Sequence, residues 1–184
     1  MAGENTTGFL SPQDVHDRLG VLSGMKVADF GCGAGEFAVL IAKTVGPDGL
    51  VTAIDVLTSA LESVTARARV AGLENVQTIR ANLEVAGGSK LHDASQDMVL
   101  ASSVLIQSKN PADIIGEAKR ILKFEGTLAA IEWKKGATAS FGPPDADRID
   151  SASLQKLLEM HGFSIISQFD AGAYHYGMVA KKQQ

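Results

Sequence analysis

The 184-residue chain is predicted to fold as an α/β domain built on a mostly parallel sheet of seven strands. Short apolar runs alternate with longer amphipathic stretches, which is typical of strands whose connecting helices cover a parallel sheet. A glycine-rich turn follows the first strand, where such sheets commonly bind ligands. Two final apolar runs flank a four-residue spacer, which predicts an antiparallel hairpin at one edge of the sheet.

Composition narrows the class of protein further. The chain is 45% hydrophobic and 21% charged, as folded globular proteins are, and its net charge of −4 argues against broad nonspecific binding to a nucleic-acid backbone. Cys32 is the only cysteine, so a disulfide within the chain and a thiolate zinc cluster are excluded, and no metal site is expected. Without an apolar run long enough to span a membrane or a leader sequence, we expect a cytoplasmic protein with no membrane partner.

The N-terminal residues 1–24 are expected to form a helical segment in front of the main domain, residues 25–184, with which they make a single domain. Ser11 can cap a helix from Pro12 to Leu19, because a capping serine followed by proline and an acidic residue favours a helix start.

Apolar runs place the seven strands in order along the chain. They are Lys26–Phe30, Leu50–Asp55, Val76–Ala81, Met98–Ser102, Thr127–Trp133, Phe163–Phe169 and Tyr174–Ala180. Helical spacing of apolar residues predicts four further helices around Phe37–Val45, Ala60–Ala68, Ile114–Leu122 and Leu154–His161. Two segments lack such patterns, the crossover Leu83–Gln96 and the loop Lys134–Arg148 with its glycines and prolines. Loops of that length in a compact domain are often functional.

The glycine-rich turn after the first strand carries the clearest chemical signal. Gly31, Gly33 and Gly35 allow a sharp turn and let backbone N–H groups approach a ligand closely. A dinucleotide-binding turn would have a third glycine where Glu36 stands, and a carboxylate there would repel a diphosphate at the helix N-terminus. Asp55, twenty residues beyond Gly35, has the spacing of a carboxylate that accepts hydrogen bonds from ribose hydroxyls. Together these residues predict a nucleoside ligand without phosphates near the loop.

The run Asp29-Phe30-Gly31-Cys32-Gly33-Ala34-Gly35, with Asp55 downstream, resembles the cofactor motif of class I S-adenosylmethionine-dependent methyltransferases. The order of strands and helices extends the resemblance from Met25 to Ala180, and the chain is most similar to the small single-domain branch with quinone-biosynthesis-like and arsenite-like members. The resemblance implies a Rossmann-like sheet in the order 3-2-1-4-5-7-6 and S-adenosylmethionine as the cofactor.

The resemblance also implies a role for residues at the ends of the first four strands. In the family the glycine loop holds the methionine part of the cofactor, the acid corresponding to Asp55 holds the ribose, and the next residue, Val56, packs on the adenine. Asn82 stands where family members often have a carboxylate, and its amide oxygen can accept the same hydrogen bond. The expected cofactor-binding residues are Asp29, Gly31, Cys32, Gly33, Gly35, Asp55, Val56, Asn82, Leu83 and Ser102.

The methyl acceptor is expected beyond the carboxyl ends of the later strands. Candidates for contact with it are Ser103, Trp133 and Tyr174. Methyl transfer is an in-line displacement in which positioning can supply most of the catalysis, and a base is needed only if the acceptor must lose a proton. His175 and Glu132 are the candidate bases; the alternatives are a partly exposed strand-end histidine and a surface carboxylate.

Several functions stay open at the level of the sequence. A small-molecule acceptor is favoured over protein or RNA, covered by the first nineteen residues and by Lys134–Arg148. Arsenite enzymes use several cysteines, so arsenic is not expected as the acceptor. The alternatives are a macromolecular acceptor at an open site, a cofactor-binding module without turnover, and a nicotinamide-dependent oxidoreductase, which Glu36 and the terminal hairpin disfavour. A homo-oligomer is compatible with the sequence.

Overall fold

The computed structural model describes residues 10–138 and 140–184. Its strands are β1 (Lys26–Phe30), β2 (Leu50–Asp55), β3 (Val76–Arg80), β4 (Gln96–Ser102), β5 (Leu122–Trp133), β6 (Phe163–Asp170) and β7 (His175–Lys182). Its helices are α1 (Pro12–Leu19), α2 (Glu36–Val45), α3 (Thr58–Val70), α4 (Pro111–Ile121) and α5 (Ser151–Met160). Two short 3-10 turns are η1 (Leu105–Gln107) and η2 (Asp145–Asp147).

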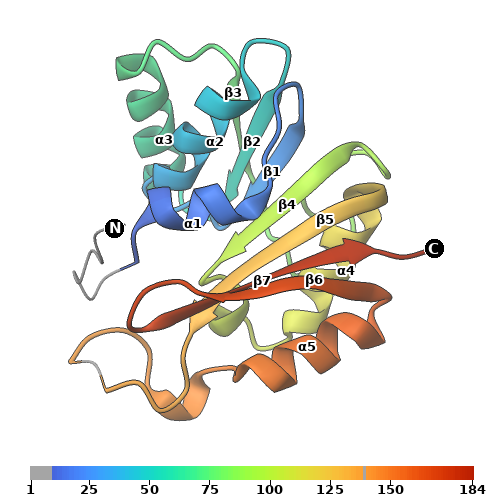
Figure 1. Cartoon of the computed structure of the whole chain (residues 1–184). Helices are drawn as coiled ribbons and strands as arrows, with labels where there is room; N and C mark the ends of the chain where they lie inside the picture. The colour runs from blue at the N-terminus through green and yellow to red at the C-terminus, as the bar shows by residue number, and fades with distance from the viewer. Residues whose placement is uncertain (1–9, 139) are drawn as a thin grey trace, which may run out of the picture.

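The strands form one sheet in the order β3-β2-β1-β4-β5-β7-β6 (Figure 1). Strand β7 runs antiparallel to both β5 and β6, whereas the pairs from β3 to β5 are parallel. The predicted fold class and strand order are therefore confirmed. Because β1, β2, β4 and β5 are parallel, their carboxyl ends lie along one edge of the sheet, which is where the candidate site residues were expected.

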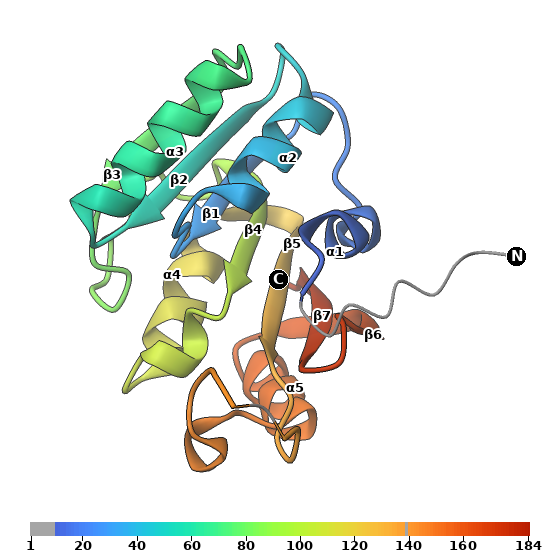
Figure 2. The same cartoon turned by 90° about the vertical axis from the view of Figure 1, so that its left-hand side faces the viewer.

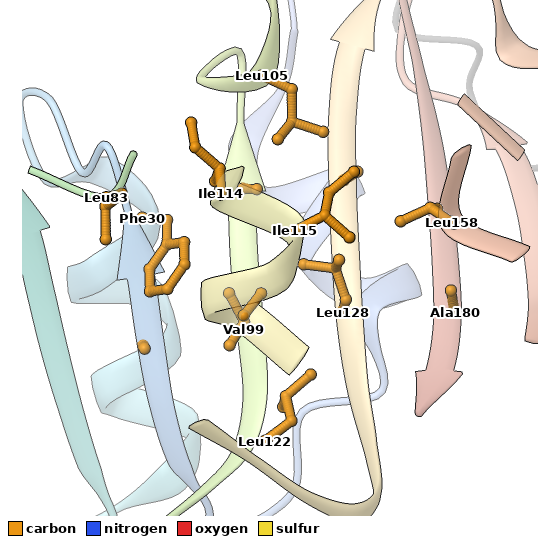
Figure 3. Close-up of a cluster of buried hydrophobic side chains, with 14 of the residues drawn as sticks. Phe30, Leu83, Val99, Leu105, Ile114, Ile115, Leu122, Leu128, Leu158 and Ala180 are labelled. Atoms are coloured by element: carbon orange, nitrogen blue, oxygen red, sulfur yellow. The ribbon is translucent and has the colours of Figure 1, made fainter. Parts of the chain in front are cut away.

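Helices cover both faces of the sheet (Figures 1 and 2). One face packs on α4 and α5 around a buried cluster that includes Phe30, Val99, Ile115 and Leu158 (Figure 3). The other face packs on α1, α2 and α3 around a second cluster that includes Ile41. Burial of apolar side chains on both faces explains why the inner strands read as nearly continuous apolar runs.

The first helix is held by a local cap and by the second core cluster. The Asp14 backbone N–H donates to Ser11 Oγ at 3.3 Å, as the sequence predicts. Val15 and Leu19 are buried in the same cluster as α2. The described part of the N-terminal segment therefore shares the main core, whereas residues 1–9 of the expected cover lie outside the described residues.

The boundary between α4 and β5 differs from the prediction. Leu122 was expected at the end of the helix and the strand at Thr127, but α4 ends at Ile121 and Leu122 already pairs with Gln96 of β4. The backbone of Leu122 is extended (φ −69°, ψ 136°), and its side chain is fully buried. Helical spacing alone could not reveal this early start, because the pairing depends on a distant strand. The ladder is irregular there, and Glu125 has a left-handed φ of +60°.

The crossover between β3 and β4 is tied down by a buried carboxylate of α4. Glu117 accepts hydrogen bonds from the N–H groups of Gly87 (3.0 Å) and Ser89 (2.9 Å). Arg120 Nη2 donates to the same carboxylate at 2.6 Å. These bonds hold the pKa of Glu117 at about 2 against the opposing effect of burial. The weakly patterned crossover is thus an ordered segment whose anchor comes from another element.

Candidate functional site

The glycine loop between β1 and α2 needs glycine for steric reasons. Gly31 has a left-handed φ of +66°, and a Cβ added to it would lie 2.8 Å from Cγ2 of Val104. Gly33 also has a left-handed φ, +49°, yet a Cβ there would meet nothing within 4 Å. The loop is fixed to β2 because the N–H groups of Gly31 and Cys32 both donate to the Ile54 carbonyl, at 2.8 and 3.1 Å. Its tip is therefore held in place and open to an incoming ligand.

Asp55 lies beside this loop at the end of β2. Its Oδ2 accepts the Gly33 N–H at 3.1 Å, and its Oδ1 accepts the Leu57 N–H at 2.9 Å. Each carboxylate oxygen has a second lone pair, so Asp55 can still accept from a pair of hydroxyls. Val56 and Leu57 are 53% and 61% exposed, and they offer an apolar surface next to that carboxylate.

Asp29, near the end of β1, is a buried acid with unmet hydrogen-bonding capacity. It is 2% exposed, and its Oδ2 has no hydrogen-bond partner in the described structure. Burial first, and then the negative charge of Asp55, raise the pKa of Asp29 to about 7. A buried carboxyl oxygen without a partner is costly, and a positively charged ligand group nearby would relieve that cost.

The remaining expected cofactor residues differ in accessibility. Cys32 is 8% exposed, and burial raises the pKa of its thiol to about 12, so it is a packing residue and not a nucleophile. Asn82 is exposed, and its Oδ1 accepts the Glu84 N–H at 3.0 Å. Leu83 is buried in the first core cluster, whereas Ser102 is half-buried at the end of β4.

The two candidate bases lie on opposite faces of the sheet. Glu132 pairs with Tyr176 across the β5–β7 ladder, and Trp133 pairs with His175. Since successive side chains of a strand point to opposite faces, Glu132 and His175 do not converge on one atom. Glu132 is 0% and His175 3% exposed, so the interpretation of either as a surface residue is wrong: the β5–β7 pairing lies inside the protein.

Glu132 is bonded to the segment that follows β4. Its Oε1 accepts the Leu105 N–H at 3.1 Å, while its Oε2 is buried and has no partner in the described residues. Burial outweighs the backbone hydrogen bonds and raises the pKa of Glu132 to about 8.

His175 belongs to an aromatic group at the carboxyl edge of β5. Its ring lies 4.2 Å from the Trp133 ring, and Phe141 bridges Trp133 and Tyr174 with edge contacts at 5.8 and 5.2 Å. Burial, followed by the charges of Arg148 and Lys134, lowers the pKa of His175 to about 4. The imidazole is therefore neutral near pH 7, and its Nδ1 has no hydrogen-bond partner in the described structure.

Arg148 organises the loop above these rings, and sequence reasoning missed it. Its Nη1 donates to the carbonyls of Lys134 (3.0 Å) and Ala137 (2.7 Å), and its Nε donates to Pro143 O at 3.1 Å. The guanidinium lies 5.4 Å from the Trp133 ring centre and is almost fully buried. The glycines and prolines signalled a loop, but no local pattern marked its last residue as the one that joins both ends.

Other kinds of site have no support within the described ranges. There, no group of three or more histidine, cysteine, aspartate or glutamate residues is arranged to hold a metal ion. In the same part of the chain, no helix is both long enough and apolar enough to cross a membrane.

The sheet with its antiparallel hairpin, the glycine loop and Asp55 are together typical of the Rossmann-like, class I S-adenosylmethionine-dependent methyltransferase family. A family model described as "Methyltransferase domain" matches residues 22–168, and the chain belongs to this family. The resemblance inferred from the sequence is thereby confirmed.

Individual relatives agree with this assignment. Demethylmenaquinone methyltransferase from Listeria welshimeri is 30% identical over 129 residues, which cover 66% of this chain and 53% of that protein. The chain thus spans about half the length of the curated relatives it matches. A SAM-dependent methyltransferase from Aquifex aeolicus superimposes with a TM-score of 0.85 at 27% identity, covering 97% of this chain and 93% of its own. An arsenic (III) S-adenosylmethionine methyltransferase from Chlamydomonas reinhardtii shares the fold, with a TM-score of 0.69, 22% identity and coverage of 89% and 65%.

Proposed function

We propose that this protein is an enzyme that transfers a methyl group from S-adenosylmethionine to a small molecule. The observation that carries the proposal is the grouping of the open glycine loop, the Asp55 carboxylate and the unpartnered Oδ2 of Asp29 at one edge of the sheet. When bound, S-adenosylmethionine supplies a methyl group made electrophilic by its sulfonium.

Each part of that grouping suits one part of the cofactor. The glycine loop would hold the methionine portion, and the second lone pairs of Asp55 would accept the two ribose hydroxyls. Exposed Val56 offers an apolar contact for the adenine. The free oxygen of Asp29 would either accept a hydrogen bond from the cationic amino group of the cofactor or support the glycine loop that holds it.

For the acceptor we propose a small molecule with a planar ring. Support comes from the aromatic group of Trp133, Phe141 and Tyr174 and from relatives named for demethylmenaquinone. Ser103 would line the same space, and neutral His175 would take a proton from the acceptor where one must leave. Because His175 is only 3% exposed, the side chains that pack against it must move before it can reach an acceptor.

Cofactor class is tested by thermal unfolding with S-adenosylmethionine, S-adenosylhomocysteine, NADH and NADPH in parallel. A ligand at 100 times its dissociation constant adds about 2.7 kcal/mol of stability, which shifts the midpoint by roughly 5–10 °C in a domain of this size. We expect a shift with the two sulfur compounds alone. A shift only with a nicotinamide would show that the interpretation of Glu36 is mistaken, and no shift with any of the four would refute the proposal.

Turnover is tested with a methyl-labelled donor and three acceptor pools: demethylated quinols, total RNA and total protein. Label in the quinol pool is expected. Label in RNA or protein instead would show that the acceptor is a macromolecule and not a small molecule. Cofactor binding without any transfer would favour a binding module. His175→Ala should lower turnover with little change in cofactor affinity, and unchanged turnover would remove His175 from the reaction.

A further inference from the structure

Glu132 joins the end of β5 to the start of η1. The Leu105 N–H donates to Glu132 Oε1, and the Leu105 side chain is buried in the first core cluster near Ile114 and Ile115 (Figure 3). The carboxyl thus fixes the backbone at the point where the chain leaves β4 and turns toward α4.

This stretch of backbone lies against the glycine loop and includes an unfavourable conformation. Ser103 has a left-handed φ of +54°, which residues other than glycine rarely adopt, and its N–H donates to Ile131 O at 2.8 Å. The next residue, Val104, is the one that a Cβ on Gly31 would meet at 2.8 Å. Strained residues persist where their surroundings hold them, and they concentrate at functional sites. The position of residues 103–105 therefore bears directly on the shape of the cofactor edge.

The geometry does not favour Glu132 as a base. A base must come within hydrogen-bond reach of the proton that it removes, but Glu132 is 0% exposed and lies on the opposite face from Trp133 and His175. With a pKa of about 8, its carboxyl is also largely protonated near pH 7. A neutral carboxyl that already accepts a backbone N–H is suited to fixing the position of that backbone segment.

We propose that Glu132 is a positioning residue that holds residues 103–105 against the glycine loop and so sets the wall between cofactor and acceptor. The proposal rests on the proposed methyltransferase function, because the wall matters only if both ligands meet there. Glutamine should replace Glu132 well, since its amide oxygen can accept the Leu105 N–H and it matches a protonated carboxyl in size and charge.

The test compares Glu132→Gln and Glu132→Ala with Glu117→Gln as the matched control. Glu117 is also a buried carboxylate that accepts backbone N–H bonds, but it anchors the crossover at Gly87 and Ser89. Hydrogen exchange of the Leu105 amide, S-adenosylhomocysteine affinity by calorimetry, and kcat and KM are measured for each variant. We expect Glu132→Ala to speed exchange at Leu105 at least tenfold and to weaken affinity at least fivefold, with lower kcat. Glu132→Gln should stay within about threefold of wild type in all three measurements.

Two results would overturn the proposal. If the Leu105 amide of Glu132→Ala exchanges at the wild-type rate, the Glu132 carboxyl does not hold that segment. A hundredfold loss of turnover in Glu132→Gln, with exchange and affinity intact, would show that Glu132 exchanges a proton with the acceptor. If Glu132→Ala does not fold, the glutamine variant still decides between positioning and proton transfer. Wild-type protein that binds no S-adenosylhomocysteine would refute the proposed function, whereas exchange at Leu105 would still report whether Glu132 holds the segment.

Discussion

Three acidic residues at the carboxyl edge of the sheet have different surroundings and so suit different tasks. Asp55 accepts two backbone N–H bonds and stays partly open to solvent. Asp29 is buried with a free oxygen beside the loop, and Glu132 is buried with one oxygen bonded to Leu105. Only Asp55 combines a fixed carboxylate with free lone pairs and access, which is what recognition of a pair of hydroxyls requires.

Replacement of Asp55 by asparagine should weaken cofactor binding. The substitution removes the charge and one acceptor oxygen, and hydrogen bonds to a charged group contribute about 1.5–3 kcal/mol. We expect the dissociation constant for S-adenosylhomocysteine to rise about 10- to 150-fold in calorimetry. Asp97→Asn is the control, because Asp97 also accepts a backbone N–H, from Lys26, but at the opposite end of the sheet. Equal affinity in Asp55→Asn and wild type would show that Asp55 does not hold the ribose.

At the residue scale, the sequence revealed the site residues whose signal is local. The glycine loop and Asp55 could be predicted because fixed spacing along one strand-turn-helix unit determines where they lie. The burial of Glu132 and His175 could not be predicted, since it depends on the β5–β7 register. Arg148 gave no signal either, because its partners are backbone carbonyls, which every residue carries.

Among the elements, the loop 134–148 combines a functional position with an internal anchor. Gly142 lies over Trp133, where a Cβ would come within 2.5 Å of the indole ring, so the loop packs directly on the aromatic group. Arg148 donates to carbonyls on both sides of Gly142. In the described residues of the loop, Arg148 and Asp145, whose Oδ1 accepts the Gly136 N–H at 2.6 Å, join segments on either side of Gly142, and opening of the loop would uncover Trp133.

Arg148→Ala should release this loop without altering the cofactor edge. Three part-buried backbone carbonyls would lose their donor, and the loop would open locally because water can then replace the missing hydrogen bonds. Cleavage by thermolysin within residues 134–148 should become at least tenfold faster, and the KM for the acceptor should rise. Affinity for S-adenosylhomocysteine should stay within twofold of wild type. If thermolysin cleaves Arg148→Ala at the wild-type rate, other contacts hold the loop closed.

Element boundaries were predictable where a cap or turn fixed them. Ser11 accepts a backbone N–H at the start of α1, as predicted, and Asp150 accepts one in the same way at the start of α5. The start of β5 was wrong by several residues because Leu122 suits the apolar face of α4 as well as the strand. Apolar spacing cannot show whether Leu122 ends the helix or begins the strand, because no glycine or proline separates it from Ile121.

On the scale of the whole molecule, alternating strands and helices with a terminal hairpin predicted a mostly parallel sheet, and the strand order followed from the resemblance to the methyltransferase family. The resulting sheet buries ionisable groups within its core layers. Asp29, Glu132 and His175 all lie there, with less than 4% of their surface exposed. Burial favours the neutral form of each group, so the stability of the protein without ligand must depend on pH.

The sign of that dependence follows from the direction in which each pKa moves on folding. Asp29 and Glu132 have raised pKa values of about 7 and 8, so the folded state keeps protons that the unfolded state has lost, and stability falls as pH rises toward 8. His175, with its pKa lowered to about 4, acts in the opposite sense, and its contribution is lost as pH falls from 6.5 to 4. Glu117 has its pKa lowered to about 2, so its contribution to stability is also lost only at acid pH. The opposing effects overlap between pH 4 and 6.5, whereas of these four groups only Asp29 and Glu132 titrate above that range.

The ligand-free protein should therefore lose stability between pH 6.5 and 8, by an amount on the order of 2 kcal/mol, since stability changes by about 1.4 kcal/mol per pH unit for each proton that the folded state alone retains. Urea unfolding at pH 5, 6.5 and 8 at constant ionic strength measures this loss. The double variant Asp29→Asn/Glu132→Gln cannot ionise at either position, and its free energy of unfolding should be nearly constant from pH 6.5 to 8. An equal decline in wild type and double variant would place the titrating groups elsewhere. A constant wild-type stability over the same range would show that Asp29 and Glu132 are already ionised in the folded protein at pH 6.5, and the buried edge would then have to supply charges that stabilise both carboxylates.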